Sequence, residues 1–186
     1  MNILIVGVGG QGTLLASRIL GNLAPILGLE VKLNEVHGMA QRGGSVVTHV
    51  KMADKVYSPV IAEGDADAVL AFEVLEGYRY RHFLKKGGIM VVNTQEILPM
   101  PVITGAAEYP KDLAKHLREE CGAITVDALA AANEIGNART VNTVILGCFA
   151  RIAGIACADL EKALEQSVKP KLLEVNKTAL KKGYSL

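Results

Sequence analysis

Near the start of the chain lies a segment with the composition and spacing of a phosphate-binding turn. The sequence Gly7-Val8-Gly9-Gly10-Gln11-Gly12 follows a short apolar run and precedes Thr13, where a helical pattern of apolar residues begins. Glycines let the backbone turn sharply and approach a ligand, and the first N–H groups of a helix are free to bind an anion. This order predicts an anion or nucleotide site. Its candidate residues are Gly7, Gly9, Gly10, Gln11, Gly12 and Thr13.

The glycine turn leaves more than one interpretation open. Its spacing matches a dinucleotide fingerprint, and Glu35 lies at the end of the next predicted strand, where an acid can bind a ribose hydroxyl. One alternative is therefore a stand-alone NAD- or FAD-binding oxidoreductase that uses Gly7, Gly9, Gly12 and Glu35. Another is a tight turn that binds nothing. The 186 residues leave little room for the separate catalytic domain that the dinucleotide enzyme needs.

A second glycine-rich segment follows the next predicted strand. Its candidate residues are His37, Met39, Gln41, Arg42, Gly43 and Gly44. An arginine beside paired glycines can reach a phosphate or carboxylate while the backbone bends freely. Loops at strand ends carry ligand and partner contacts in open α/β sheets, so we expect this loop at a subunit interface or near the substrate. Arg139 is a further candidate anion contact, and Asn142 is expected to cap a helix or bond to the Arg42 loop.

The elements that must position these residues alternate between strands and helices. Strands are expected at 2–6, 31–36, 45–52, 56–60, 68–72, 89–92 and 123–126. Helices are expected at 11–24, 74–83, 111–120, 127–135, 140–155, 160–167 and 170–182. The alternation predicts a three-layer α/β/α Rossmann-like fold with a mostly parallel sheet. A turn at 53–55 predicts an antiparallel hairpin of 45–52 with 56–60. Gly183 is expected to end the last helix, and 1–186 to form one domain.

Composition excludes several classes of function. Twenty basic and nineteen acidic residues give a net charge of +1, and without a basic run nucleic-acid binding is not expected. The cysteines, Cys121, Cys148 and Cys157, are far apart and lack metal-ligand spacing, so we expect no metal or iron–sulfur site and a reducing cytoplasm. No apolar run approaches the ~18 residues of a membrane helix, and no signal peptide is expected.

Three segments together resemble the gamma subunit of 2-oxoacid:ferredoxin oxidoreductases, nearest to the indolepyruvate oxidoreductase beta subunits. The first is the glycine turn at 7–12, and the second is His37-Gly38-Met39-x-Gln41-Arg42-Gly43-Gly44 with the strand after it. The third is Gly136-Asn137-x-Arg139-x-x-Asn142-x-x-x-Leu146-Gly147. The chain end is also similar, with Lys169-Pro170-Lys171, Asn176 and Gly183-Tyr184. The resemblance covers nearly the whole chain.

The resemblance implies a place in a multi-subunit enzyme. Such enzymes oxidatively decarboxylate a 2-oxoacid, here indolepyruvate or another aryl pyruvate, to acyl-CoA, using thiamine diphosphate, iron–sulfur clusters, CoA and ferredoxin. This chain has neither a cluster-type cysteine set nor a thiamine motif. We therefore expect it to carry no cofactor and no catalytic residue, and to be inactive alone. Its expected partners are the thiamine- and iron–sulfur-bearing subunits, and ferredoxin through them.

Overall fold

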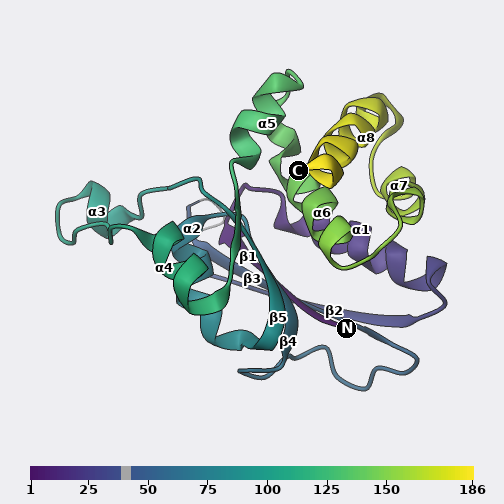
Figure 1. The fold of residues 1–186 in the computed structure, drawn as a ribbon, viewed down its shortest axis with the longest axis horizontal. Helices are drawn as coiled ribbons and strands as arrows, with labels where there is room; N and C mark the ends of the chain where they lie inside the picture. The colour runs from purple at the N-terminus through teal and green to yellow at the C-terminus, as the bar shows by residue number, and fades with distance from the viewer. Residues whose placement is uncertain (39–42) are drawn as a thin grey trace.

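A single mixed sheet of six strands, in the order β2-β3-β1-β4-β5-β6, forms the centre of the molecule (Figure 1). The computed structural model describes residues 1–38 and 43–186. The strands are β1 (Asn2–Val8), β2 (Glu30–His37), β3 (Ser45–Ala53), β4 (Ala66–Ala71), β5 (Leu84–Asn93) and β6 (Ile124–Val126). β1, β4, β5 and β6 pair in parallel, and β3 pairs antiparallel with both β1 and β2. Among the described strands only β3 is reversed, so the mostly parallel sheet is confirmed.

The antiparallel hairpin uses a different pair of strands from the predicted pair. β2 and β3 form it, in a register that runs from Glu30 opposite Ala53 to His37 opposite Val46. The predicted strand at 56–60 is wrong, because these residues are in no strand. Its Val56 N–H donates instead to the Glu30 carboxylate, at 3.0 Å. A proline within 56–60 also removes a ladder donor, which disfavours a paired strand there.

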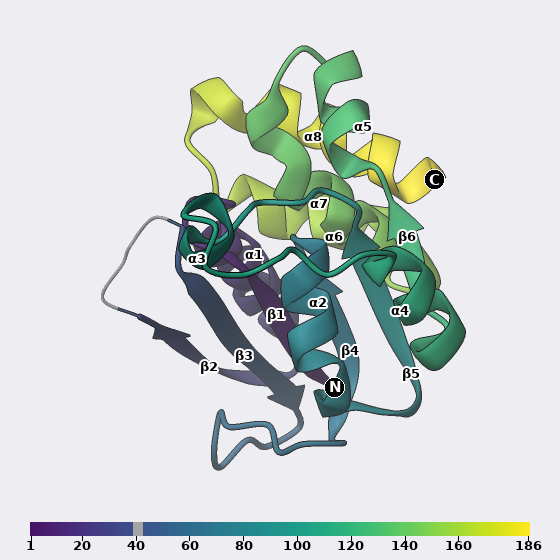
Figure 2. The same ribbon diagram turned by 90° about the vertical axis from the view of Figure 1, so that its left-hand side faces the viewer.

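Helices cover both faces of the sheet (Figures 1 and 2). They are α1 (Thr13–Ile26), α2 (Val74–Tyr80), α3 (Met100–Ile103), α4 (Leu113–Cys121), α5 (Ala128–Glu134), α6 (Val141–Ile152), α7 (Cys157–Glu165) and α8 (Pro170–Ser185). Two short 3-10 helices are η1 (Arg81–Phe83) and η2 (Ala138–Thr140). Because side chains alternate along β1, Leu4 and Val6 pack toward α2 and α4, whereas Ile3 and Ile5 pack toward α1 and α6. The predicted three-layer α/β/α fold is confirmed.

The C-terminal helix continues through the glycine that was predicted to end it. Gly183 lies inside α8, where an added Cβ would stand 1.9 Å from the carbonyl oxygen of Val144 on α6. From the other side, a Cβ on Gly147 of α6 would stand 2.2 Å from the carbonyl oxygen of Leu180. The two backbones are therefore in direct contact. Gly183 is needed for this close crossing, and the prediction that it stops the helix is wrong.

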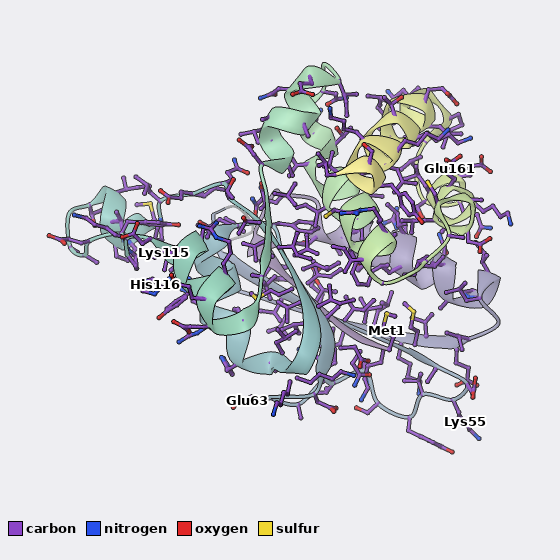
Figure 3. The ribbon with its side chains drawn as sticks, in the orientation of Figure 1. Met1, Lys55, Glu63, Lys115, His116 and Glu161 are labelled. Atoms are coloured by element: carbon purple, nitrogen blue, oxygen red, sulfur yellow. The ribbon has the colours of Figure 1, made fainter. Side chains whose placement is uncertain are left out.

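Charged side chains lie on the outer surfaces of the helices. Figure 3 shows Lys115 and His116 on α4 and Glu161 on α7 at the edge of the molecule. Glu161 pairs with Lys181 of α8 at 3.4 Å, so an ion pair links these two helices.

No helix within 1–38 and 43–186 is long and apolar enough to cross a membrane.

Candidate functional site

The glycine turn joins β1 to α1 at the carboxyl end of the parallel strands, where the sequence predicts it. Several of its backbone donors are already used within the protein. The N–H of Val8 donates to Oε1 of Gln11 at 2.8 Å, and the N–H of Gly9 donates to the Gly44 carbonyl at 2.9 Å. The N–H of Gln11 returns to the Val8 carbonyl at 3.1 Å. The set of donors left for an anion is therefore smaller than the motif alone indicates.

The donors that remain lie at the helix start. Within the described chain, the N–H groups of Gly10, Gly12 and Thr13 have no hydrogen-bond acceptor in the protein. Gly12 has a φ of 83° and immediately precedes α1. An added Cβ there would stand 2.6 Å from Nδ2 of Asn142, which donates to the Gly12 carbonyl at 3.2 Å. Gly12 therefore has a packing role, and Gly10 and Thr13 flank it with free donors.

A cleft of about 410 Å³ opens over this turn. It is lined by Gly10, Gln11, Gly12, Gln95, Leu129, Ala138, Arg139 and Val141. Arg139 belongs to η2, which begins where Oδ1 of Asn137 accepts the Arg139 N–H at 3.0 Å. Its side chain is exposed, and no carboxylate pairs with it among the described residues. The structure thus brings a free arginine to the glycine turn from a distant part of the sequence.

Asn142 supports the turn from inside the protein. It is the second residue of α6, is 2% exposed, and does not cap that helix. Its Oδ1 accepts the N–H of Thr143 at 2.9 Å, and the hydroxyl of Thr143 donates to Oδ1 of Asn176 on α8 at 2.8 Å. The predicted helix cap is wrong, and any contact with the Arg42 loop lies outside the described residues. A buried polar chain therefore links Gly12 to the C-terminal helix.

A second cleft, of about 300 Å³, lies on the other side of Gly10. It is lined by Gly9, Gly10, Thr13, Leu14, Glu35, His37 and Val46. Glu35 is on the outer strand β2, and its carboxylate accepts the hydroxyl of Thr48 at 3.3 Å. In the dinucleotide fingerprint the acid follows a parallel strand beside the first. Here the reversed β3 separates β2 from β1, so Glu35 is one strand farther from the turn.

The second glycine-rich loop also ends beside the turn. His37 is the last residue of β2, and Gly43, which has a φ of 77°, precedes β3. Gly44 accepts the Gly9 N–H, and Gly43 N–H faces the Gly9 carbonyl at 3.4 Å. Three candidates of this loop lie outside the described residues: Met39, Gln41 and Arg42. The described ends of the loop therefore adjoin the second cleft and the glycine turn.

Gln95 lines the main cleft and was not among the predicted residues. It follows β5 and its carbonyl accepts the N–H of Val74 at 3.2 Å, so its backbone is held against α2. Asn93, which is fully buried, ends the same strand. A signal was present in the sequence, because polar residues directly after a buried parallel strand stand at the edge where α/β proteins bind ligands.

Two buried carboxylates lie behind the turn at the same edge. Glu73 accepts the N–H of Glu76 at 2.9 Å, the N–H of Ile97 at 3.1 Å and the hydroxyl of Tyr109 at 2.8 Å. Burial raises the pKa of Glu73, although these hydrogen bonds oppose the shift. Glu76 binds the Arg79 guanidinium at 2.6 Å. The acceptor positions of Glu73 are occupied by donors that hold segment 97–109 against α2, which is an anchoring role.

The three cysteines lie in different parts of the fold. Cys148 is buried among the α6 core residues, whereas Cys121 packs on the opposite face of the sheet and Cys157 begins α7. Burial raises the pKa of all three thiols, which disfavours the thiolate form that metals and clusters need. In the described part of the chain no group of three or more His, Cys, Asp or Glu side chains could hold a metal. These residues do not fit an iron–sulfur cluster.

Similarity to known proteins identifies the family of this chain. Residues 2–186 match the family model described as pyruvate ferredoxin/flavodoxin oxidoreductase. The chain belongs to this oxidoreductase family. Its relatives include the indolepyruvate oxidoreductase subunit IorB of Thermococcus kodakarensis, 39% identical over 98% of this chain and 93% of the relative. The IorB of Archaeoglobus fulgidus is 40% identical over 100% and 94%. The pyruvate/ketoisovalerate oxidoreductases common subunit gamma of Pyrococcus furiosus is 30% identical over 96% and 92%.

Solved structures of the oxidoreductase family share the fold. The pyruvate oxidoreductase subunit PORC of Thermotoga maritima is 25% identical with a TM-score of 0.74, over 100% of this chain and 95% of that one. The matched chain of 2-oxoglutarate:ferredoxin oxidoreductase from Magnetococcus marinus, which has coenzyme A bound, has a TM-score of 0.71 at 20% identity. The match covers 100% of this chain and 30% of that one. The predicted resemblance is confirmed: the chain is a gamma-type oxidoreductase subunit, which does not favour the stand-alone NAD or FAD enzyme.

Proposed function

We propose that this chain is the subunit without cofactors in a cytoplasmic, thiamine-dependent oxidoreductase that converts indolepyruvate or another aryl pyruvate to acyl-CoA. Full-length similarity to relatives named indolepyruvate oxidoreductase subunit IorB supports the substrate. Its three free cysteines, which lie apart and do not suit a cluster, support a reducing compartment and partners that carry the redox groups.

The reaction divides between the proposed partners and this chain. In such an enzyme thiamine diphosphate supplies the electron sink for decarboxylation, and iron–sulfur clusters pass electrons to ferredoxin. This chain then has the task of binding and orienting a ligand at its cleft. No step of bond breaking is assigned to its residues.

The observation that supports ligand binding most strongly is that Arg139 and the glycine turn line the same cleft. A guanidinium is always charged and can bind a phosphate through two hydrogen bonds. The start of α1 adds partial positive charge and the N–H donors of Gly10, Gly12 and Thr13. We propose that the cleft binds the phosphate-bearing part of a nucleotide, with CoA as the candidate.

We also propose that loop 37–44 faces the thiamine-bearing subunit. Its described ends, at His37 and at Gly43 and Gly44, adjoin the turn, so a partner that covers the cleft would meet this loop. Arg42 is the residue of the loop best suited to a charged contact across that interface.

The cleft assignment is tested by Arg139→Ala. Loss of a charge-assisted hydrogen bond to phosphate costs about 1.5–3 kcal/mol, so the dissociation constant for CoA should rise roughly tenfold or more. We would measure it by isothermal titration calorimetry on the full chain and on its complex with the partner.

The matched control is Arg151→Ala, because Arg151 is an exposed arginine at the end of α6, away from the cleft. CoA affinity should be unchanged in that variant. Equal CoA affinity in wild type and Arg139→Ala would exclude the proposed site. Tight NAD binding with turnover by the chain alone would instead favour the dinucleotide enzyme.

A further inference from the structure

Carboxamide side chains gather at the carboxyl end of β1, β4 and β5, and backbone groups fix the direction of two of them. Oδ1 of Asn93 accepts the N–H of Ala128 at 3.2 Å, and its Nδ2 donates to the Phe72 carbonyl at 3.0 Å. Oε1 of Gln11 accepts the N–H of Val8 at 2.8 Å, and its Nε2 donates to the same Phe72 carbonyl at 2.8 Å. An amide oxygen only accepts and an amide nitrogen only donates, so neither side chain can be reversed without breaking both bonds.

These two fixed amides determine the direction of a third. Nε2 of Gln11 and Nδ2 of Asn93 each lie 3.4 Å from Oε1 of Gln95. Two donors require an acceptor between them, so the NH₂ group of Gln95 points away from both. Gln95 is half-buried and lines the cleft with Gly10 and Arg139. Among the described residues its Nε2 has no acceptor in the protein. A donor is therefore left free at the wall of the cleft.

We propose that Gln95 is a ligand-binding residue, whose Nε2–H donates a hydrogen bond to an acceptor oxygen of the ligand in this cleft. The inference rests on the proposed function and extends it. Arg139 supplies charge from one side, whereas Gln95 supplies a neutral donor at a position fixed by Gln11 and Asn93. A donor held in place selects a ligand that presents an oxygen there, and it disfavours a ligand that presents an N–H or O–H donor.

The acceptor oxygen is assigned to a phosphate group. Gln95 shares the cleft with Arg139 and with the start of α1, and both attract an anion. CoA also contains amide carbonyl oxygens in its pantetheine arm, which offer the same acceptor chemistry without charge. ADP and pantetheine separate these two sources, because each carries only one of them.

The direct test is Gln95→Glu. A carboxylate still accepts from Gln11 and Asn93, so the local packing is kept, but the group that faces the cleft becomes a negatively charged acceptor. Titration calorimetry with the full chain and with the complex should show CoA and ADP affinity reduced about tenfold or more, because the donor is lost and the charges repel. Pantetheine affinity should change little. Gln166→Glu, an identical change at an exposed site after α7, should leave all three affinities and the melting temperature unchanged.

A second variant, Gln95→Met, separates the loss of the donor from the effect of added charge. It removes the donor without adding charge, but it also removes the acceptor of Gln11 and Asn93, so thermal melting is measured for both variants to confirm that they fold. Reduced affinity for CoA and ADP in both variants supports the assignment to phosphate. Reduced affinity for CoA and pantetheine, with ADP unchanged, supports the role of Gln95 and moves its contact to the pantetheine arm.

The Arg139 and Gln95 variants distinguish the role of Gln95 from ligand binding by the cleft as a whole. CoA binding that Arg139→Ala weakens, but that both Gln95 variants leave unchanged, would overturn the role of Gln95 alone. No CoA or ADP binding by the wild-type chain or its complex would overturn the cleft and the role of Gln95 together.

Discussion

At the scale of single residues, the candidate site residues fall into two groups, according to whether the protein itself supplies their contacts. Gly12 and Asn142 make contacts that the protein itself satisfies: the amide of Asn142 fills the space beside Gly12 and bonds its carbonyl at 3.2 Å. Arg139 differs, because its exposed guanidinium has no carboxylate partner among the described residues. A charged group placed beside free N–H donors and left unpaired is suited to a ligand that the protein does not contain.

Arg42 gives a residue-scale prediction for the interface. Arg42→Ala should leave the melting temperature of the isolated chain nearly unchanged, because a surface change usually alters stability within ~0.5 kcal/mol. If Arg42 forms charge-assisted hydrogen bonds across the interface, binding to the thiamine-bearing subunit should weaken by about 2–5 kcal/mol. Surface plasmon resonance with the partner subunit measures this, and thermal melting checks the fold. Arg18→Ala, at an exposed site on α1, is the matched control. Equal affinity for the partner in the wild type, Arg42→Ala and Arg18→Ala would contradict the proposal that loop 37–44 lies at the interface.

At the scale of elements, α6 organises the helical layer. Its first turn holds Asn142 against the glycine turn, and its middle contacts the backbone of α8 at Gly147. From Val141 to Ala150 every residue of α6 is buried. A helix that is enclosed on all sides transmits any displacement to its neighbours, because close-packed interiors do not absorb added volume. The position of the cleft therefore depends on how α8 packs.

Gly183→Ala tests the close contact between α6 and α8. The added Cβ would overlap the Val144 carbonyl, from which it would stand 1.9 Å away, so α8 must move from α6. We expect the free energy of unfolding to fall by about 1–3 kcal/mol or more, as is typical of overpacking. Urea denaturation followed by circular dichroism measures it. Gly38→Ala is the control, since a Cβ there meets nothing within 4 Å. A loss of stability no larger than in the control would show that α8 tolerates separation from α6.

Some elements can be predicted from local sequence, whereas others depend on contacts between distant residues. The β-forming residues of Ser45–Ala53 predict a strand, but its reversed place between β1 and β2 depends on long-range pairing. The local pattern therefore predicts a hairpin with 56–60 instead. The local sequence predicts a helix stop at Gly183, because a close helix crossing leaves no local signal. The residue types of Arg139 and of the glycine turn pointed to an anion, whereas their shared cleft and the fixed direction of Gln95 require the fold.

At the scale of the whole molecule, the candidate site residues lie together at one end of the sheet. The glycine turn lines both clefts at the carboxyl edge of β1, with Arg139 at the first cleft and His37, at one end of loop 37–44, at the second. The cysteines lie elsewhere and apart, and family membership places this chain among oxidoreductase subunits. We therefore propose that this chain binds and orients a ligand, and that a partner subunit carries out decarboxylation and electron transfer.

Reconstitution tests this central claim most directly. The purified chain, the purified thiamine-bearing partner and their mixture would each be assayed for reduction of ferredoxin with indolepyruvate and CoA. We predict that the chain alone is colourless and inactive, and that acyl-CoA forms at full rate only in the mixture. Stoichiometric iron with visible absorption in the purified chain, or turnover of indolepyruvate by the chain alone, would contradict the account.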